Sequence, residues 1–409
     1  MKAGQLRIVF FLLVFSAAVQ AQEPCATHLY SRAKLQTDAG QRLAINRAEE
    51  FIRQVQAAPG TNRLENGIIK IPVVFHNLYH TADQKITDAQ VYAQLDMLNR
   101  AFRRRNADTV NTPAVFRPLA ADCMIEFHLA TSDPGRRYTN GIIRKYSPVL
   151  KWTMDDRMKK SAETGSDAWD PSKYLNIWVC NLEKFAGYST LPGSDVSLDG
   201  IVLGLGALNP SYETIIHEAG HWLGLKHIWG DEYCGDDGVS DTPKQAAYTP
   251  GCPTTVRVTC GNGPAGDMYM NYMDFTAAAC TNLFTHGQKQ RMWASFAFGG
   301  PRHSLLESAG LDKPLIQESQ PLDEGEPRWL EIRIFPNPVN SILYLDFSYD
   351  ARWIGKRIYV TNVSGQQITS EVVTSKIHSL NVDKLRPGIY FLAANNDQGL
   401  SMRMKFVKL

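Results

Sequence analysis

The spacing of apolar and polar residues divides the chain into three parts. In the middle part, the β-branched run GIIKIPVVFHNLY at 67–79 predicts a strand, and apolar periodicity after the capping pair Thr87-Asp88 predicts a helix over 87–104. A further helix is expected to start at 209–211. Three more apolar runs predict strands: CMIEFHLATSDP at 123–134, YLNIWVCNL at 174–182 and DGIVLGLGAL at 199–208. We therefore expect residues 67–311 to form an α/β (α+β) domain with a mixed sheet.

The two flanking parts differ from this domain. Residues 22–66 are polar and favour helix, with apolar residues at helical spacing in AGQRLAINRAEEFIRQVQ, and they predict a separate leader, or propeptide. Residues 312–328 are acidic, contain proline and lack periodicity, which predicts an exposed linker. Residues 329–409 hold short alternating strands between turns such as NPVN and VSGQ, which predicts a small all-β sandwich. Because this last part has no cluster of metal ligands or nucleophiles, we expect a binding or sorting role.

The amino terminus resembles a signal peptide. Lys2 and Arg7 precede the apolar run IVFFLLVFSAAV, and Val19 and Ala21 have the small-residue spacing that signal peptidase accepts, so we expect residues 1–21 to be removed. No apolar run is long enough to be a transmembrane segment. The 43 basic and 41 acidic residues leave a net charge of +2, which does not indicate nucleic acid as a partner. We expect an exported protein, either secreted or on the cell surface.

The stretch HEAGHWLGLKH at 217–227 predicts a metal site. His217 and His221 are four residues apart, so their imidazoles point the same way on a helix. Gly224 can adopt the left-handed conformation, which would end the helix and bring His227 back as a third ligand. Three imidazoles with a free fourth position are typical of a catalytic Zn²⁺ site, because a structural site is normally closed by a fourth protein ligand.

Glu218 is the predicted general base. It lies about 100° from His217 around the helix, close enough to hold a zinc-bound water but badly placed to be a ligand. Zinc would lower the pKa of this water and polarise the carbonyl, while Glu218 passes the proton to the leaving amine. The alternative is an amphipathic helix that carries two histidines by chance, which the glycine and the third histidine at this spacing disfavour.

Seven cysteines in an exported chain make disulfides possible. Four lie in a stretch rich in Gly, Pro and Asp after the histidine motif, and we expect two bridges among them: Cys234, Cys252, Cys260 and Cys280. Cys123 and Cys180 lie in apolar runs, which fits either a third bridge or two buried thiols. Cys25 lies in the leader, where its thiolate could fill the fourth zinc position and keep an enzyme latent; the alternative is an unpaired thiol without a role.

The segment CGDDGVSDTP predicts a second metal site. It brings Asp236, Asp237 and Asp241 together with Thr242 in a tight turn that contains glycine. Oxygen ligands at this density suit Ca²⁺, which would fix a loop that packing alone leaves loose. A solvated acidic turn is the alternative.

Several segments together resemble the pappalysin family (M43-type) of metzincin metalloproteases. HEAGHWLGLKHIWGD, DGVSDTP and NYMDFTAAACTNLFTHGQ resemble its zinc helix, its calcium-binding loop and its Met-turn segment, which contains Met273. FPNPVNSILYLDF and PGIYFLAA resemble the C-terminal sorting domain of the type IX secretion system. The resemblance implies a metzincin-like catalytic domain that acts on proteins or peptides and is exported by that machinery.

The resemblance also bears on the cysteines. It implies a crossed pairing, Cys234 with Cys260 and Cys252 with Cys280. The amino-terminal CATHLY is similar to the cysteine-bearing start of the propeptides of relatives, which favours the latency role of Cys25.

Two departures from the family affect the expected activity. Many relatives carry a tyrosine two residues after the Met-turn methionine, whereas Phe275 here has no hydroxyl to support the oxyanion; losing such a donor can cost about a hundredfold where it acts. Relatives that cleave before arginine or lysine carry an acidic residue where this chain has TAAAC at 276–280. Without a carboxylate there we expect a small or apolar residue just after the cut bond.

The sequence therefore predicts a secreted zinc-dependent endopeptidase that is made as a zymogen. The competing function is a zinc-stabilised surface adhesin, or binding protein, whose catalysis was lost with the tyrosine. The intact Glu218 favours the endopeptidase, because a structural zinc site does not need a base.

Overall fold

The computed structural model describes residues 25–57, 67–318, 331–395 and 401–409. The predicted signal peptide at 1–21 lies outside these residues, as do the end of the predicted leader and most of the predicted linker. The domain boundaries therefore remain predictions. No helix in the described ranges has the length and apolar character needed to cross a membrane.

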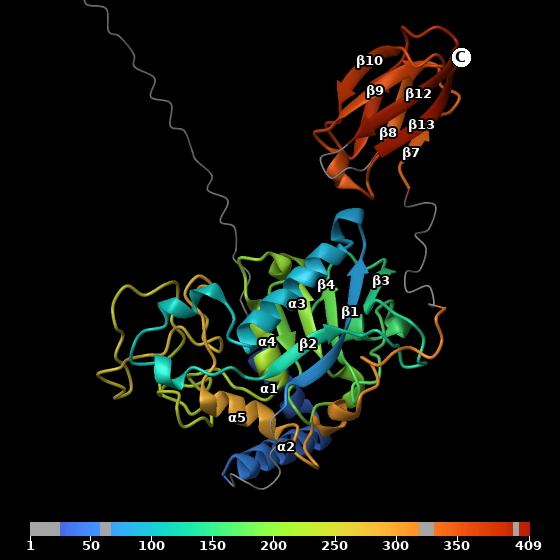
Figure 1. The fold of residues 1–409 in the computed structure, drawn as a ribbon. Helices are drawn as coiled ribbons and strands as arrows, with labels where there is room; N and C mark the ends of the chain where they lie inside the picture. Colours follow the sequence, from blue (N-terminus) through green and yellow to red (C-terminus); the bar gives the residue numbers. More distant parts are fainter. Residues whose placement is uncertain (1–24, 58–66, 319–330, 396–400) are drawn as a thin grey trace, which may run out of the picture.

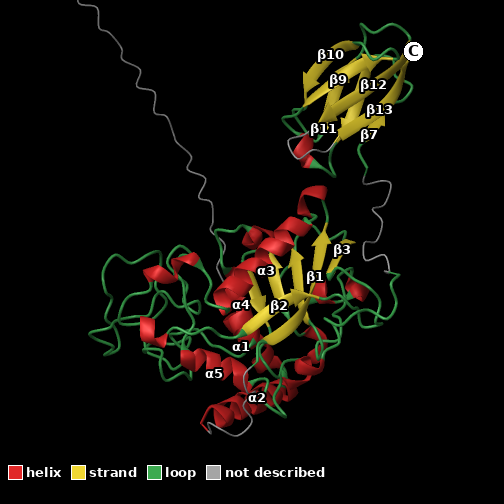
Figure 2. Cartoon of the chain, viewed as in Figure 1, coloured by secondary structure: helices red, strands yellow, loops and turns green. Residues whose placement is uncertain are grey.

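The middle of the chain is built on a six-stranded mixed sheet (Figures 1 and 2). Its strands are β1 (Ile69–Tyr79), β2 (Ile125–Leu129), β3 (Ile142–Tyr146), β4 (Leu175–Cys180), β5 (Gly187–Ser189) and β6 (Ile201–Gly204). Their order is β2-β1-β4-β6-β5, and β3 also pairs with β1. All pairs are parallel except that β5 runs antiparallel to β6. Strand β4 is buried along its whole length, which is why its sequence is a continuous apolar run.

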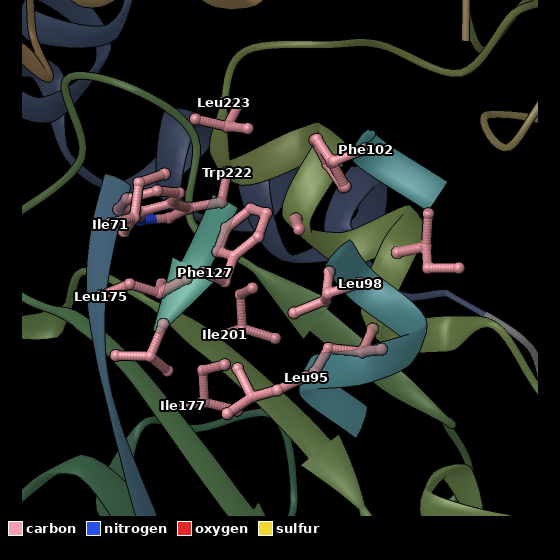
Figure 3. Close-up of a cluster of buried hydrophobic side chains, with 14 of the residues drawn as sticks. Ile71, Leu95, Leu98, Phe102, Phe127, Leu175, Ile177, Ile201, Trp222 and Leu223 are labelled. Carbon is pink, nitrogen blue, oxygen red and sulfur yellow. The ribbon is translucent and has the colours of Figure 1, made fainter. Parts of the chain in front are cut away.

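Two helices, α3 (Asp88–Phe102) and α4 (Thr214–Trp222), cover one face of this sheet (Figure 1). Helix α3 begins with a capping box, in which the Thr87 hydroxyl accepts from the Gln90 N–H and the Gln90 side chain accepts from the Thr87 N–H. Leu98 from α3, Trp222 from α4 and Ile177 from β4 meet in the main core (Figure 3). This packing fixes α4 against the sheet.

The opposite face of the sheet carries a second apolar cluster. Trp178 and Tyr188 from the strands are buried there together with Tyr30 from α1 (Thr27–Thr37). The next helix, α2 (Ala39–Ala57), packs against α5 (His286–Ala294). The predicted leader is therefore packed against the middle part of the chain, residues 67–311.

Most of the predicted elements are confirmed, with three corrections. Strands β3 and β5 were not predicted, because β3 is only partly buried and β5 has three residues. The strand expected at 199–208 is shorter and continues as a 3₁₀ turn, Leu205–Leu208. Helix α4 starts at Thr214 and not at 209–211, because Asn209 is extended, as expected before a proline.

The carboxyl-terminal part forms two antiparallel sheets, as predicted for a sandwich. One sheet has the order β10-β9-β12-β13 and the other β11-β8-β7. Leu345, Val360 and Leu392 from the two sheets share one buried core. The strands are β7 (Arg333–Phe335), β8 (Ile342–Asp346), β9 (Arg357–Asn362), β10 (Gln367–Val372), β11 (Ile377–Asn381), β12 (Gly388–Asn395) and β13 (Ser401–Lys408).

Candidate metal centre and active site

Helix α4 and the turn after it position three histidines. His217 and His221 lie on one side of the helix, and Gly224 has a φ of +97°, the left-handed conformation that was predicted to end it. The turn brings His227 back toward the helix. A Cβ at Gly220 would lie 2.5 Å from the Met273 sulfur, so only glycine lets the Met-turn pack directly against α4.

The three imidazoles converge on one point. The Nε2 atom of His221 lies 3.0 Å from that of His217 and 3.0 Å from that of His227, and the remaining Nε2 pair is 3.2 Å apart. All three rings are buried. Burial lowers the pKa of His217 to about 4 and the pKa values of His221 and His227 well below the usual range. The rings are therefore neutral at physiological pH.

The other ring nitrogen of each histidine has a fixed acceptor. His217 Nδ1 donates to the Tyr272 carbonyl at 2.7 Å, and His221 Nδ1 donates to the Leu225 carbonyl at 2.8 Å. His227 Nδ1 is paired with the Asp231 carboxylate. With each proton held on Nδ1, the three Nε2 lone pairs face one another. These lone pairs repel one another unless a cation lies between them. The residues present therefore fit a zinc ion.

Cys25 from the leader completes this cluster. Its Sγ and the ligand atoms of the three histidines all lie within 4.8 Å of one another. Cys25 is buried, and burial together with the nearby Glu218 carboxylate raises the pKa of its thiol. A sulfur atom therefore lies within reach of an ion that the three histidines could hold.

Glu218 is buried beside the cluster. Its Oε2 accepts a hydrogen bond of 2.6 Å from the Thr27 hydroxyl of the leader. Burial raises the pKa of the carboxyl group to about 7, and the hydrogen bond from Thr27 partly opposes this shift. A carboxyl group with a pKa near neutrality is suited to accept and return a proton.

The leader also occupies the edge of the sheet beside the metal cluster. The Ala26 N–H donates to the Gly187 carbonyl on β5 at 2.9 Å, and the Ser189 N–H donates to the Thr27 hydroxyl at 2.8 Å. Strand β5 is the edge strand, so its outer backbone groups have no partner strand in the sheet and pair with the leader instead. An extended peptide can use the same edge.

Aromatic rings form one wall of the site. Trp229 stacks on His227 with ring centroids 4.4 Å apart, and the Phe275 centroid lies 4.8 Å from that of His227. Phe275 thus lies beside the candidate ligands but has no hydroxyl. The wall holds the His227 ring by packing.

A cavity of about 370 Å³ opens beside His217. Ala277 and Ala279 line it, but so does Glu213, whose carboxylate accepts from the Thr281 hydroxyl and whose pKa burial raises to about 7. Glu213, the residue just before α4, therefore gives this cavity a carboxylate that TAAAC at 276–280 does not supply. It was not predicted, although it lies four residues, about one helical turn, before His217. The preference for the residue after the cut bond stays a prediction.

The four residues predicted to bind calcium do not converge in the same way. Thr242 donates to both carboxylate oxygens of Asp237 at 2.9 Å, and Asp236 is exposed near Lys244. Asp241 instead accepts from the Thr285 hydroxyl and from the Gly287 N–H at the start of α5. Within the described ranges, the histidine and Cys25 set is the one grouping of three or more metal-binding side chains. Calcium stays a prediction.

Two disulfides fix the loop after the histidines. They join Cys234 to Cys260 and Cys252 to Cys280, which is the crossed pairing that the resemblance implied. Cys123 and Cys180 are both free and buried, so the possibility of a third bridge between them is excluded. They belong to different apolar clusters.

Comparisons with known proteins agree with this site. The family model described as pregnancy-associated plasma protein-A, a peptidase of the M43 type, matches residues 158–297, and that of a secretion system C-terminal sorting domain matches residues 333–408. An extracellular metalloprotease of Neurospora crassa is 29% identical over 70% of this chain and 95% of its own length.

Solved structures of two forms of one protease are also similar. Mature mirolysin of Tannerella forsythia in complex with a cleaved peptide is 42% identical, with a TM-score of 0.57 over 59% of this chain and 96% of that chain. A promirolysin mutant of the same organism is 38% identical, with a TM-score of 0.64 over 70% of this chain and 97% of that chain.

The fold and this site define a secreted or cell-surface zinc metalloendopeptidase. The chain belongs to the pappalysin family of M43-type metalloproteases and carries a type IX secretion sorting domain at its carboxyl end. The competing function as an adhesin is therefore not supported.

Proposed function

We propose that His217, His221 and His227 hold one zinc ion and that Glu218 is the general base of peptide hydrolysis. The observation that carries this proposal is the convergence of three Nε2 atoms within 3.2 Å, with each Nδ1 bonded to an acceptor. When bound, zinc supplies a water of near-neutral pKa and polarises the carbonyl of the cut bond. Glu218 accepts the proton of the attacking water and returns it to the leaving nitrogen.

The remaining groups of the site orient the substrate. The free edge of β5 pairs with the substrate backbone, as it does with Ala26 of the leader. The cavity beside His217 receives the side chain that follows the cut bond. Asp231 keeps the Nε2 lone pair of His227 directed at the metal.

Removal of the metal tests the proposed function. The processed protein, freed of its leader, should cleave casein, and a zinc chelator should stop the cleavage because the three imidazoles cannot polarise a carbonyl by themselves. Added zinc should restore activity. Undiminished cleavage by protein that metal analysis shows to be zinc-free would contradict the proposal.

We also propose that the leader keeps the enzyme latent through residues 25–28. Cys25 fills the fourth ligand position, and Thr27 hydrogen-bonds the carboxylate of Glu218. His28 adds a contact to Asp231, with its Nδ1 3.3 Å from a carboxylate oxygen. The leader thus contacts the proposed zinc site, the general base and the substrate-binding edge of β5 at the same time.

We expect Glu213 to make the cavity prefer a basic side chain after the cut bond. In Glu213→Gln, the ratio of kcat/KM for peptides with lysine against methionine at this position should fall about tenfold, because an ion pair is lost while the shape is kept. Since the pKa of Glu213 is about 7, the carboxyl is protonated at lower pH, and the wild-type preference should grow as pH rises through 7. The exposed Glu163→Gln is the control. An unchanged ratio in Glu213→Gln would refute this assignment.

A further inference from the structure

Beyond the metal, helix α1 reaches a buried carboxylate in the catalytic part of the chain. The Lys34 ammonium lies 2.7 Å from Asp156 Oδ2, and the Tyr30 hydroxyl donates to the same oxygen at 3.0 Å. The Asp156 side chain is only 1% exposed, whereas that of Lys34 is 32% exposed. The ammonium group therefore reaches from the surface to a buried carboxylate. Below, Asp156 with its neighbours Lys159 and Tyr188, which α1 covers, is called the recess.

The rest of this recess belongs to the catalytic part of the chain. Lys159 is completely buried and places its ammonium 3.0 Å from Asp156 and 2.8 Å from the Leu198 carbonyl. The Tyr188 ring lies 4.8 Å from that of Tyr30. Asp156 has a φ of +63°, an unusual conformation for a residue with a side chain, which persists only where the surroundings impose it. The position of Asp156 is thus fixed by residues outside the leader.

The partners of Asp156 come partly from the leader and partly from the rest of the chain. Lys159 and the Tyr188 hydroxyl stay beside Asp156 when the leader is absent. The neighbouring Asp199 keeps its own partner, Arg302. When the leader leaves, Asp156 loses both Lys34 and Tyr30, which raises the cost of keeping this carboxylate buried.

The recess lies beside strand β5, which pairs with the substrate in the proposed function. Tyr188, on its wall, is the middle residue of β5, between the two residues that hold Ala26 and Thr27. Along helix α1, Lys34 is about 10 Å from Thr27 at 1.5 Å per residue. An extended peptide covers that distance in about three residues at 3.3 Å each. A substrate side chain a few residues from the cut bond can therefore reach Asp156.

We propose that this recess is a substrate subsite that the leader fills in the zymogen and that binds a lysine or arginine side chain of the substrate in the mature enzyme. Asp156 is the ion-pair partner, and Tyr188 covers the aliphatic part of the bound side chain. This proposal rests on the proposed proteolysis and on removal of the leader. It adds a preference for a basic side chain at a second substrate position, some three or four residues from the cut bond.

Cleavage-site mapping of a peptide library by the mature enzyme tests the subsite. We expect lysine and arginine to be enriched about tenfold over methionine at one position some three or four residues from the cut. In Asp156→Asn this enrichment should fall to within about twofold, measured as a ratio of kcat/KM for matched lysine and methionine peptides. A wild-type enzyme that cleaves the library without such enrichment, or an Asp156→Asn enzyme that keeps it, would overturn the proposal. A mature enzyme that cleaves nothing would instead refute the proposed function.

A second measurement does not depend on the folding of Asp156→Asn or on activity. In the full-length zinc-loaded protein carrying Glu218→Ala, which should not process itself, Lys34→Met should increase hydrogen exchange across α1 about tenfold. The control is Arg32→Met, because Arg32 is exposed on the same helix and forms no ion pair within the described ranges. Equal exchange in the two variants would show that the recess does not bind the cation and would also overturn the proposal.

Discussion

The mature enzyme with Glu218→Ala is expected to lose about a thousandfold in kcat/KM on casein while it keeps its zinc. Glu218 is buried beside the three histidines, and its pKa of about 7 lets it take a proton at neutral pH and return it. General acid–base groups of this kind contribute about 10²- to 10⁴-fold. Because the histidine Nδ1 atoms bond to Tyr272, Leu225 and Asp231 and not to Glu218, the ligand geometry does not depend on this carboxylate.

Two measurements make this result specific. Metal analysis should find one zinc ion per chain in both the wild type and Glu218→Ala. The exposed Glu163→Ala removes a carboxylate of the same kind elsewhere and should keep wild-type turnover. A Glu218→Ala enzyme that retained more than about a tenth of the activity would show that another group acts as the base.

The second large effect is expected for Cys25→Ala in the precursor. Removing the thiol opens the fourth ligand position, so activity of the unprocessed chain should rise at least tenfold over that of the wild-type precursor, about 1.4 kcal/mol or more of lost inhibition. Activation should remain incomplete until the leader is cut, because Thr27 still bonds to Glu218 and Ala26 still pairs with β5. A chromogenic peptide assay, with samples taken before any processing band appears, measures this rise.

A matched thiol variant serves as the control. Cys123 is also free and buried, but it lies in the main core and not among the metal ligands. Cys123→Ala should therefore leave the precursor as latent as the wild type. Equal activity of the Cys25→Ala and wild-type precursors would show that latency depends on other contacts of the leader.

The histidine cluster could be predicted because it lies within one short stretch of sequence. The spacing of His217, His221 and His227 is local, and Gly224 at the end of the helix explains how the third histidine returns. Helical and β periodicity likewise predicted α3, β1 and β4, which are long enough to show a pattern. The disulfide pairing required knowledge of a family, because spacing alone could not choose it.

The parts that could not be predicted depend on contacts between distant segments. Strand β5 has three residues and no pattern, yet it forms the edge that binds the leader. Asp241 is placed by α5, forty-four residues or more further on, so its role in capping that helix is not visible in its own acidic turn. Asp156 and Lys34 are far apart in the sequence, and their ion pair appears only when α1 packs on the sheet.

Three consecutive residues of the leader, 25–27, have an implication for inhibitor design. Cys25 offers a thiol to the metal, Ala26 a backbone N–H to β5, and Thr27 a hydroxyl to Glu218. Each of these groups contacts a different part of the site. A small compound that carries all three at the same spacing should therefore bind the mature enzyme as an inhibitor. Selectivity against other metalloproteases would then come from what is attached at its carboxyl end.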